Sequence, residues 1–386
     1  MRKLYLDKNL QFVFGVTLMT VMGVSSIIPA LPDIIEGLHI GPAHIGWVIS
    51  AFTLPGVLLA PLVGILADRI GRKAILVPSL FLFGIFGTAC FFASDIKTLL
   101  WLRFFQGVGA APLGVLYGTI IGDLYEGRER AAAMGVNASV LAMGTAAYPG
   151  VGGLLAMLGW QWPFLLPATA IPLGLAVILK MDAPEPRSHE ALSDYIRNAA
   201  RLMATRQAMS LFATTFLTFV ILYGPLITYM PILLDERYGL SSAAIGFVFL
   251  TASFLTGLAS FRLGRLAHAF GTRKLLMTAA VLYGASMLGI PNVPSFIWIF
   301  VPVICFGLAQ GLNIPLVMTL LTSLAPMQQR GAFMAANGLL LRLAQTVAPV
   351  LMGGIYVLFG MQGVFLGGLV CALIIFWLAM FRIVDE

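Results

Sequence analysis

The 386-residue chain is poor in charge, cysteine and histidine. It has 16 acidic and 23 basic residues, whereas 60% of its residues are hydrophobic, and a soluble protein of this length would carry more charge. The cysteines Cys90, Cys305 and Cys371 lie far apart, and the four histidines show no metal-ligand spacing. Neither a disulfide framework nor a metal site is indicated. A Walker A phosphate-binding sequence is also absent, which excludes direct drive by ATP, and nothing indicates an enzyme or catalytic residues.

Long apolar runs occupy most of the chain. A helix needs roughly 20 apolar residues to cross a bilayer, so the composition is sufficient for about twelve spans. The predicted spans are residues 10–31, 45–67, 74–92, 98–121, 131–158, 163–179, 207–234, 241–267, 275–290, 296–320, 331–358 and 363–381. The predicted fold class is an all-α polytopic membrane protein with twelve transmembrane helices, and its surroundings are the lipid bilayer.

The basic residues predict the orientation in the membrane. All but four of the 23 lie in loops or near span ends on one side, whereas Lys97 and Arg237 lie on the other side, and Arg103 and Arg342 lie deep inside spans. Because cytoplasmic loops carry the excess of Lys and Arg, both termini are predicted to be cytoplasmic. The net charge of +7 is divided among short clusters between apolar runs, so nucleic acid is excluded as a partner. We expect a bacterial inner (plasma) membrane protein.

The two halves of the chain repeat each other. A polar stretch, residues 181–206, is predicted to be a cytoplasmic linker between an N-terminal six-helix bundle, 1–180, and a C-terminal one, 207–386. A shift of 200 residues superimposes many positions, whereas Gln106-Gly107 aligns with Gln310-Gly311 at a shift of 204, which a small loop insertion would explain. The pairs at 200 include Gly71 and Gly271, Arg130 and Arg330, Asn137 and Asn337, and Pro149 and Pro349. Parallel repeats of this kind build transporters whose site lies between two rocking halves.

The loop between the second and third spans reads Gly64-Ile-Leu66-Ala-Asp68-Arg69-Ile-Gly71-Arg72-Lys73. Its charges alone are those of an ordinary basic cytoplasmic loop, but the full pattern resembles the loop signature of the major facilitator superfamily. The resemblance implies two pseudo-symmetric six-helix bundles that the acid and cations latch on the cytoplasmic side in the outward-open state. The second copy has His268 in place of the acid, so its latch should be weaker or pH-sensitive. The implied latch residues are Gly64, Asp68, Arg69, Gly71, Arg72 and Lys73.

Two further segments are candidates for proton coupling. Arg103-Phe-Phe-Gln106-Gly107 resembles the family's signature for proton transfer, and Pro29-Ala-Leu-Pro32-Asp33 resembles the start of the twelve-span drug–proton antiporters. We predict that Asp33 and Arg103 form a coupling pair on the external side. As alternatives, Arg103, only about 8 Å into its helix, snorkels to the surface, and Asp33 merely terminates its span.

The fifth span contains small residues at a characteristic spacing. Gly135, Gly144, Pro149, Gly152 and Gly153 resemble the signature that separates antiporters from symporters in this superfamily, although Tyr148 replaces an expected glycine. The resemblance implies that this span meets the eighth across the bundle interface. Small residues favour helix packing in any membrane protein, so a purely structural role is the alternative.

By the same resemblance, inward-facing residues form a substrate cavity. Arg342, roughly 16 Å into its span, could select negatively charged substrates or be satisfied within the protein. The other candidates are apolar, aromatic or polar but uncharged. The candidate cavity residues are Met22, Ser26, Gln106, Tyr117, Asn137, Phe219, Tyr223, Gln310, Asn313 and Arg342.

These features predict a monomeric secondary active transporter. The leading hypothesis is proton-coupled export, or antiport, of amphipathic small molecules or drugs by alternating access, with protons as the coupling ion and no other cofactor. One alternative is a facilitator or importer of a small metabolite or organic anion. A remote alternative is a non-transporting membrane scaffold or sensor, which ligand-driven flux in liposomes would exclude.

Overall fold

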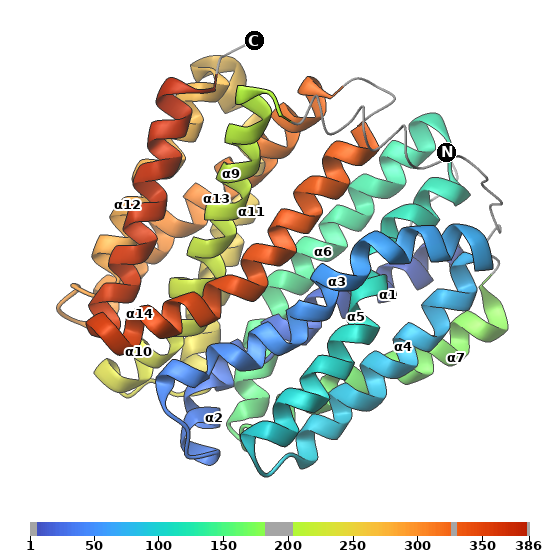
Figure 1. Cartoon of the computed structure of the whole chain (residues 1–386), viewed down its shortest axis with the longest axis horizontal. Coiled ribbons are helices and arrows are strands. Elements are labelled where there is room, and N and C mark those ends of the chain that lie inside the picture. The colour runs from blue at the N-terminus through green and yellow to red at the C-terminus, as the bar shows by residue number, and fades with distance from the viewer. Residues whose placement is uncertain (1–5, 182–203, 326–329, 384–386) are drawn as a thin grey trace. The chain divides into compact units, whose positions relative to one another are not determined.

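The computed structural model describes residues 6–181, 204–325 and 330–383, with the side chains of residues 60, 61, 64, 65, 68, 330 and 331 left out. Every regular element in these ranges is helical (Figure 1). The α-helices are α1 (Lys8–Ser25), α2 (Leu31–Gly37), α3 (Gly46–Ile70), α4 (Arg72–Ala89), α5 (Ile96–Leu124), α6 (Gly127–Ala156), α7 (Ala170–Lys180), α9 (Arg206–Ile221), α10 (Met230–Tyr238), α11 (Ser242–Phe270), α12 (Thr272–Gly289), α13 (Phe300–Leu324) and α14 (Arg330–Phe381). Shorter 3₁₀ or π segments are η2 (Ile28–Ala30), η3 (Pro42–His44), η4 (Cys90–Phe92), η5 (Trp162–Thr169), η6 (Leu222–Tyr229) and η7 (Phe296–Ile299).

Among the described residues, ten helical stretches are long and apolar enough to cross a membrane. The sequence predicted twelve, and the difference arises in the second half of the chain. α12 has Arg273 and Lys274 in its first turn and is not among the ten. α14 is a single element of 52 residues, but Gly360 breaks it with φ 66° and ψ −166°, between the two spans predicted there.

Glycine ends two of the helices at equivalent places. Gly71 precedes α4 with φ 100°, and Gly271 precedes α12 with φ 79°. Only glycine adopts this left-handed conformation without steric strain, so both turns require it. The turn predicted from the repeat therefore occurs in both halves at a shift of 200 residues.

Two compact units make up the molecule. Unit 1 comprises residues 1–41, 47–189 and 241–247, and unit 2 comprises residues 42–46, 190–240 and 248–386. In unit 1, α4 packs on α5 and α7, and α1 packs on α5 and α6. In unit 2, α14 packs on α9 and α12, and α12 packs on α13 (Figure 1). Each unit therefore includes one short segment from the other half of the sequence.

Close helix contacts recur at the same shift of 200. A Cβ atom added to Gly107 would collide with the carbonyl oxygen of Phe52, and one added to Gly307 would meet the carbonyl oxygen of Ala252. A Cβ atom added to Gly311 would likewise collide with the carbonyl oxygen of Thr256. The contact made by Gly107 therefore recurs at shifts of both 200 and 204 residues, and the 204-residue shift at Gln310 stays a prediction.

Candidate functional site

A buried cation lies at the centre of unit 1. Arg103 of α5 has no exposed surface, and its Nη1 donates hydrogen bonds of 2.8 Å to the carbonyl of Gly23 and to Oε1 of Gln106. Its Nε donates to the carbonyl of Val48 at 3.2 Å. The guanidinium carbon lies 4.3 Å from the centre of the Phe52 ring. Neutral acceptors and an aromatic face thus hold this charge, which lies too deep for the snorkelling alternative.

Two hydrogen-bond donors of the Arg103 and Gln106 side chains have no acceptor in the described structure. Nη2 of Arg103 and Nε2 of Gln106 are buried and find no hydrogen-bond partner among the described residues. A buried N–H without an acceptor costs free energy, so native proteins rarely retain one without a reason. The pair is a place where an acceptor atom of a substrate, or a water molecule, would be stabilised.

The structure does not bring Asp33 and Arg103 together. Asp33 of α2 is half-buried, and its Oδ2 accepts a hydrogen bond from Oγ of Ser242, the first residue of α11. Both residues belong to unit 1. Arg103 instead contacts the chain at Gly23, ten residues before Asp33, which corresponds to about 15 Å of helix. The expected ion pair is therefore absent between these two described side chains.

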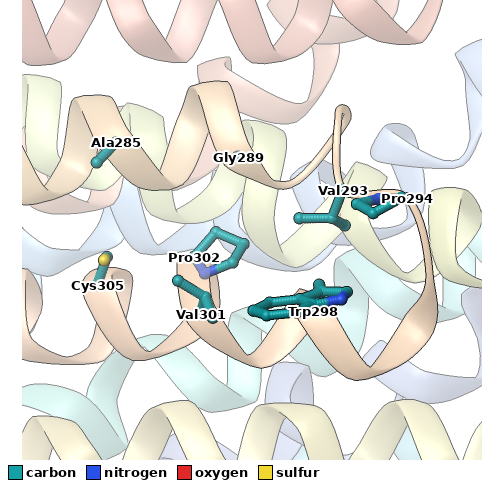
Figure 2. Close-up of a pocket in the computed structure, with 8 residues that line it drawn as sticks. All are labelled: Ala285, Gly289, Val293, Pro294, Trp298, Val301, Pro302 and Cys305. Atoms are coloured by element: carbon teal, nitrogen blue, oxygen red, sulfur yellow. The ribbon is translucent and has the colours of Figure 1, made fainter.

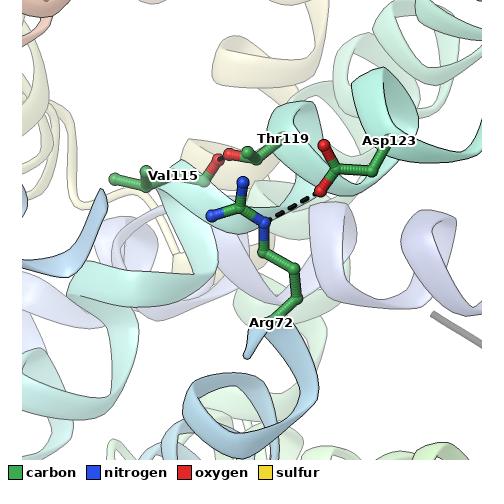
Figure 3. Close-up of polar contacts among 4 residues, drawn as sticks. All are labelled: Arg72, Val115, Thr119 and Asp123. Carbon is green, nitrogen blue, oxygen red and sulfur yellow. Dashed lines mark hydrogen bonds and ion pairs between the residues drawn. The ribbon is translucent and has the colours of Figure 1, made fainter. Parts of the chain in front are cut away.

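The predicted latch signature contains an ion pair that the sequence did not predict. Nε of Arg72 lies 2.8 Å from Oδ2 of Asp123, at the end of α5, and only 6% of the Arg72 side chain is exposed (Figure 3). Lys73 donates from Nζ to the carbonyls of Ile178 at 2.8 Å and Met181 at 3.1 Å. Both cations thus fasten α4 to the ends of neighbouring helices within unit 1.

The remaining latch residues contribute less to this arrangement. Arg69 is exposed, and Gly71 provides the turn before α4. The side chain of Asp68 and the position of a Cβ at Gly64 lie outside the described residues. In the second half, Arg273 donates to the carbonyls at 379 and 380, near the end of α14, as Lys73 does to the end of α7.

The glycine pattern of α6 brings its backbone against two neighbours. A Cβ atom on Gly152 would collide with the carbonyl oxygen of Ser26, and one on Gly153 would collide with that of Ser242. Both obstacles are backbone atoms, which cannot move aside as a flexible side chain can. Since all four residues belong to unit 1, α6 is clamped there between the end of α1 and the start of α11.

The other positions of the glycine pattern differ in how closely they pack against neighbouring helices. The carbonyl of Pro149 leaves no space for a Cβ on Gly246 of α11, and Gly144 lies against the Leu18 side chain of α1. At Gly135 no atom lies within 4 Å of an added Cβ. The resemblance grouped Gly135 with the others, but the described structure gives it no packing role.

Unit 2 presents a mixed aromatic and polar cluster. Gln345 donates from Nε2 to the Tyr223 hydroxyl at 3.0 Å, and Arg342 lies about one helical turn before Gln345 on α14. The rings of Phe219 and Tyr223 are stacked with centres 6.2 Å apart. Arg342 is partly exposed. A cation, an amide and stacked rings therefore lie together, as a binding site for an amphipathic molecule requires.

Two further amides of unit 2 are buried in hydrogen bonds. Asn313 donates to Oγ1 of Thr218 at 2.5 Å, and Gln310 accepts a hydrogen bond from the hydroxyl of Tyr283. Oδ1 of Asn313 has no partner among the described residues. Asn313 thus retains one acceptor for a ligand.

The other predicted cavity residues are mostly engaged internally. Met22 and Ser26 are buried, and the Ser26 hydroxyl donates to the Met22 carbonyl at 2.7 Å. Asn137 is buried and accepts a hydrogen bond of 2.8 Å from Thr17. Tyr117 is partly exposed. Packing accounts for Ser26 and Asn137 without a ligand.

Comparison with known proteins finds a matching family and similar chains. The family model described as Major Facilitator Superfamily matches residues 13–244 and 211–386. The bacillibactin exporter of Bacillus subtilis is 25% identical over 337 residues, which cover 84% of this chain and 84% of that protein. Multidrug resistance protein 2 of the same organism is 25% identical over 344 residues, covering 86% of this chain and 85% of that protein.

Solved structures share the fold. A bacterial homolog of the human lysosomal transporter Spinster, in an inward-facing and occupied conformation, superimposes with a TM-score of 0.79 at 18% identity, covering 97% of this chain and 96% of that one. The nucleoside transporter NupG gives a TM-score of 0.77 at 13% identity, with 97% and 98% coverage.

Proposed function

The chain belongs to the Major Facilitator Superfamily and is therefore an integral membrane transporter and not an enzyme; from this premise we propose that it exports amphipathic small molecules in exchange for protons. The names of two relatives, a bacillibactin exporter and a multidrug resistance protein, support export. The proposal includes twelve spans, with α12 as one and α14 as two. It also includes two six-helix bundles, 1–180 and 207–386, joined by a linker, cytoplasmic termini, and a monomer in a bacterial inner membrane.

The observation that carries the proposal is the backbone contact of Gly153 in α6 with Ser242 in α11, which come from different halves of the sequence. Helices that meet through backbone atoms have no interlocked side chains, so they can separate and close again at little cost. In alternating access by rocking of the two halves, a contact of this kind would be broken and formed again in every cycle. Pro149, inside α6 beside the same surface, cannot donate the usual backbone hydrogen bond of a helix.

Amphipathic substrates suit the cluster of Phe219, Tyr223, Arg342 and Gln345. Stacked rings offer apolar surface and tolerate different ligand shapes, while the cation and the amide orient a polar group. We propose that this cluster of unit 2 binds the substrate. The unpartnered donors of Arg103 and Gln106 in unit 1 offer separate polar contacts.

Asp33 is proposed as the proton-carrying group. It lies on a membrane-spanning stretch, residues 8–37, and its carboxylate accepts a hydrogen bond from Ser242. No cation lies within ion-pair distance of it among the described residues. A carboxylate bonded to a hydroxyl, without a permanent counter-charge, can gain and lose a proton as its surroundings open and close.

Proteoliposomes with an imposed pH gradient test this function. We expect an amphipathic fluorescent dye to accumulate against its gradient with wild-type protein and not with Asp33→Asn, which should still move dye down its own gradient. Ser242→Ala is the matched control, because it removes the same hydrogen bond but retains the carboxylate. Gradient-driven accumulation by Asp33→Asn would place the proton site elsewhere.

An importer or facilitator of organic anions is the second candidate. The partly exposed cation Arg342 favours it, because a guanidinium attracts a carboxylate or phosphate group. In the same proteoliposomes, Arg342→Gln should reduce anion flux selectively under this alternative and leave cationic dye unaffected. Equal effects on both substrates would mean that Arg342 is a packing residue.

A further inference from the structure

An apolar groove of about 240 Å³ lies in unit 2 between the end of α12 and the start of α13 (Figure 2). Eight residues line it, and none has a charged or amide side chain. They include Ala285 and Gly289 of α12, Val293 of the connecting loop, Trp298 of η7, and Val301 and Cys305 of α13. The lining therefore suits hydrocarbon, and its polar side-chain groups are the Trp298 indole N–H and the Cys305 thiol.

The groove opens on exposed apolar surface. More than half of the surface of Trp298 and of Val301 is exposed, as is 69% of neighbouring Ile297. In a membrane transporter, the medium around such exposed spans is the acyl chains of lipids. Trp298 lies close to the loop, where tryptophan is typical of the membrane interface. An acyl chain that follows α13 would enter the groove beside this ring.

A cation lies beside the loop that closes the groove. Arg237, at the end of α10, is exposed and donates from Nη1 to the carbonyl of Pro291. The hydroxyl of neighbouring Tyr238 donates to the carbonyl of Val293, which lines the groove, at 2.9 Å. A guanidinium has five N–H donors, so the bond to Pro291 leaves others for a phosphate group.

The charges around Arg237 restrict which type of lipid headgroup can bind there. Asp235 and Glu236 precede it and are exposed, so the end of α10 is net acidic and would repel a headgroup with only negative charge. A headgroup with a phosphate and an ammonium suits both signs. We propose that the groove holds an acyl chain of phosphatidylethanolamine from the external leaflet, with its phosphate on Arg237 and its ammonium near the two acids.

Native mass spectrometry of the purified chain tests the proposal without reference to transport. The protein is offered equal amounts of phosphatidylethanolamine, phosphatidylglycerol and phosphatidylcholine. Wild type should retain phosphatidylethanolamine selectively, and Arg237→Gln, which retains a donor for Pro291, should lower this retention about tenfold. Lys97→Gln, at the other predicted external cation, should have no effect. Ala285→Phe, which fills the groove from an exposed position, should abolish retention.

A second measurement uses Cys305, which lines the groove. Cys90 and Cys371 are replaced by serine, so that a lipid-soluble maleimide alkylates only Cys305. Added phosphatidylethanolamine should slow this alkylation when the chain also carries Lys97→Gln. It should not slow the alkylation when the chain carries Arg237→Gln instead. Equal retention of all three lipids by wild type would overturn the proposal. Wild-type retention by Arg237→Gln or by Ala285→Phe would overturn it as well, and a normal unfolding temperature verifies that each variant is folded.

Discussion

At the scale of single residues, Arg103 connects three segments of unit 1. Its guanidinium bonds to the carbonyls of Gly23 in α1 and Val48 in α3, and to Gln106 of its own helix. Arg103→Ala should lower the free energy of unfolding by roughly 3 kcal/mol or more, because it leaves buried acceptors unpaired. Gln106→Ala should cost less, since Arg103 retains both carbonyls. Thermal unfolding in detergent compares the two, and an equal loss would contradict this ranking.

The pair of Arg72 and Asp123 gives a second prediction at this scale. Asp123→Asn should reduce stability because it leaves a largely buried guanidinium without its carboxylate. A double-mutant cycle with Arg72→Gln should give a coupling free energy of about 1 to 3 kcal/mol. The same cycle between Asp123 and Lys73 serves as the control and should give a value near zero, because Lys73 bonds to carbonyls of another segment.

The sequence indicated which residues are important, but it did not predict the groups to which they bond. It predicted that Arg103 is functional, but the carbonyls of Gly23 and Val48 carry no side-chain signal by which the sequence could mark them. Asp123 lies 51 positions from Arg72, outside the signature that was used to define the latch. Partners of this kind depend on tertiary packing, which a local pattern does not encode.

At the scale of elements, α6 contains its own control for the glycine contacts. Gly152→Ala should abolish export and reduce stability, because the added methyl group would collide with the Ser26 carbonyl. Gly135→Ala meets open space and should leave export unchanged or stabilise α6 slightly, since alanine favours helix. Dye efflux and unfolding temperature are measured for both. Equal loss of export in the two variants would show that the close contact is not what matters.

The start of α5 gives a prediction that depends on pH. Asp95 caps the helix, and hydrogen bonds from the Thr98 hydroxyl and then the Thr98 N–H hold its carboxyl pKa below the usual value of 3.8. A lowered pKa means that the cap stabilises the helix above pH 3.8 and loses this effect as the pH falls through its own pKa.

Amide hydrogen exchange at residues 96–99 measures this cap. Asp95→Ala should reduce the protection factors there at neutral pH, whereas Asp95→Asn should retain them, because asparagine caps helices equally well. Protection in Asp95→Asn should also be insensitive to pH near 4. Identical pH profiles for wild type and Asp95→Asn would mean that the carboxylate does not contribute.

Elements with a strong local cause were predictable from sequence. Gly71 and Gly271 end their helices because the chain needs positive φ there, and the break at Gly360 lies between two predicted spans. The matching Gln-Gly letters alone did not decide between shifts of 200 and 204, and the backbone contacts of Gly307 and Gly311 fit one shift each. Small residues recur along the same face of a helix, so close contacts can repeat at neighbouring positions.

At the scale of the whole molecule, the repeat extends to buried hydrogen bonds. Thr17 donates to Asn137 at 2.8 Å in unit 1, and Thr215 donates to Asn337 at 2.7 Å in unit 2. Each bond joins the first helix of its half to the fifth. Asn137→Ala and Asn337→Ala should therefore destabilise their own units by similar amounts, about 1 to 3 kcal/mol. Hydrogen exchange resolves the units, and loss of protection confined to one unit in both variants would contradict the equivalence.

Unit 1 includes residues 241–247 from the second half of the sequence, and this affects the order in which the protein folds during synthesis. Ser242 and Gly246 belong to unit 1, where they lie against Gly153 and Pro149, and they leave the ribosome roughly ninety residues later. Until then the carboxylate of Asp33 also lacks its hydroxyl partner. After the first half has been inserted into the membrane, one surface of α6 therefore still lacks its contacts with α11. The newly synthesised chain completes unit 1 only while the second half is being inserted.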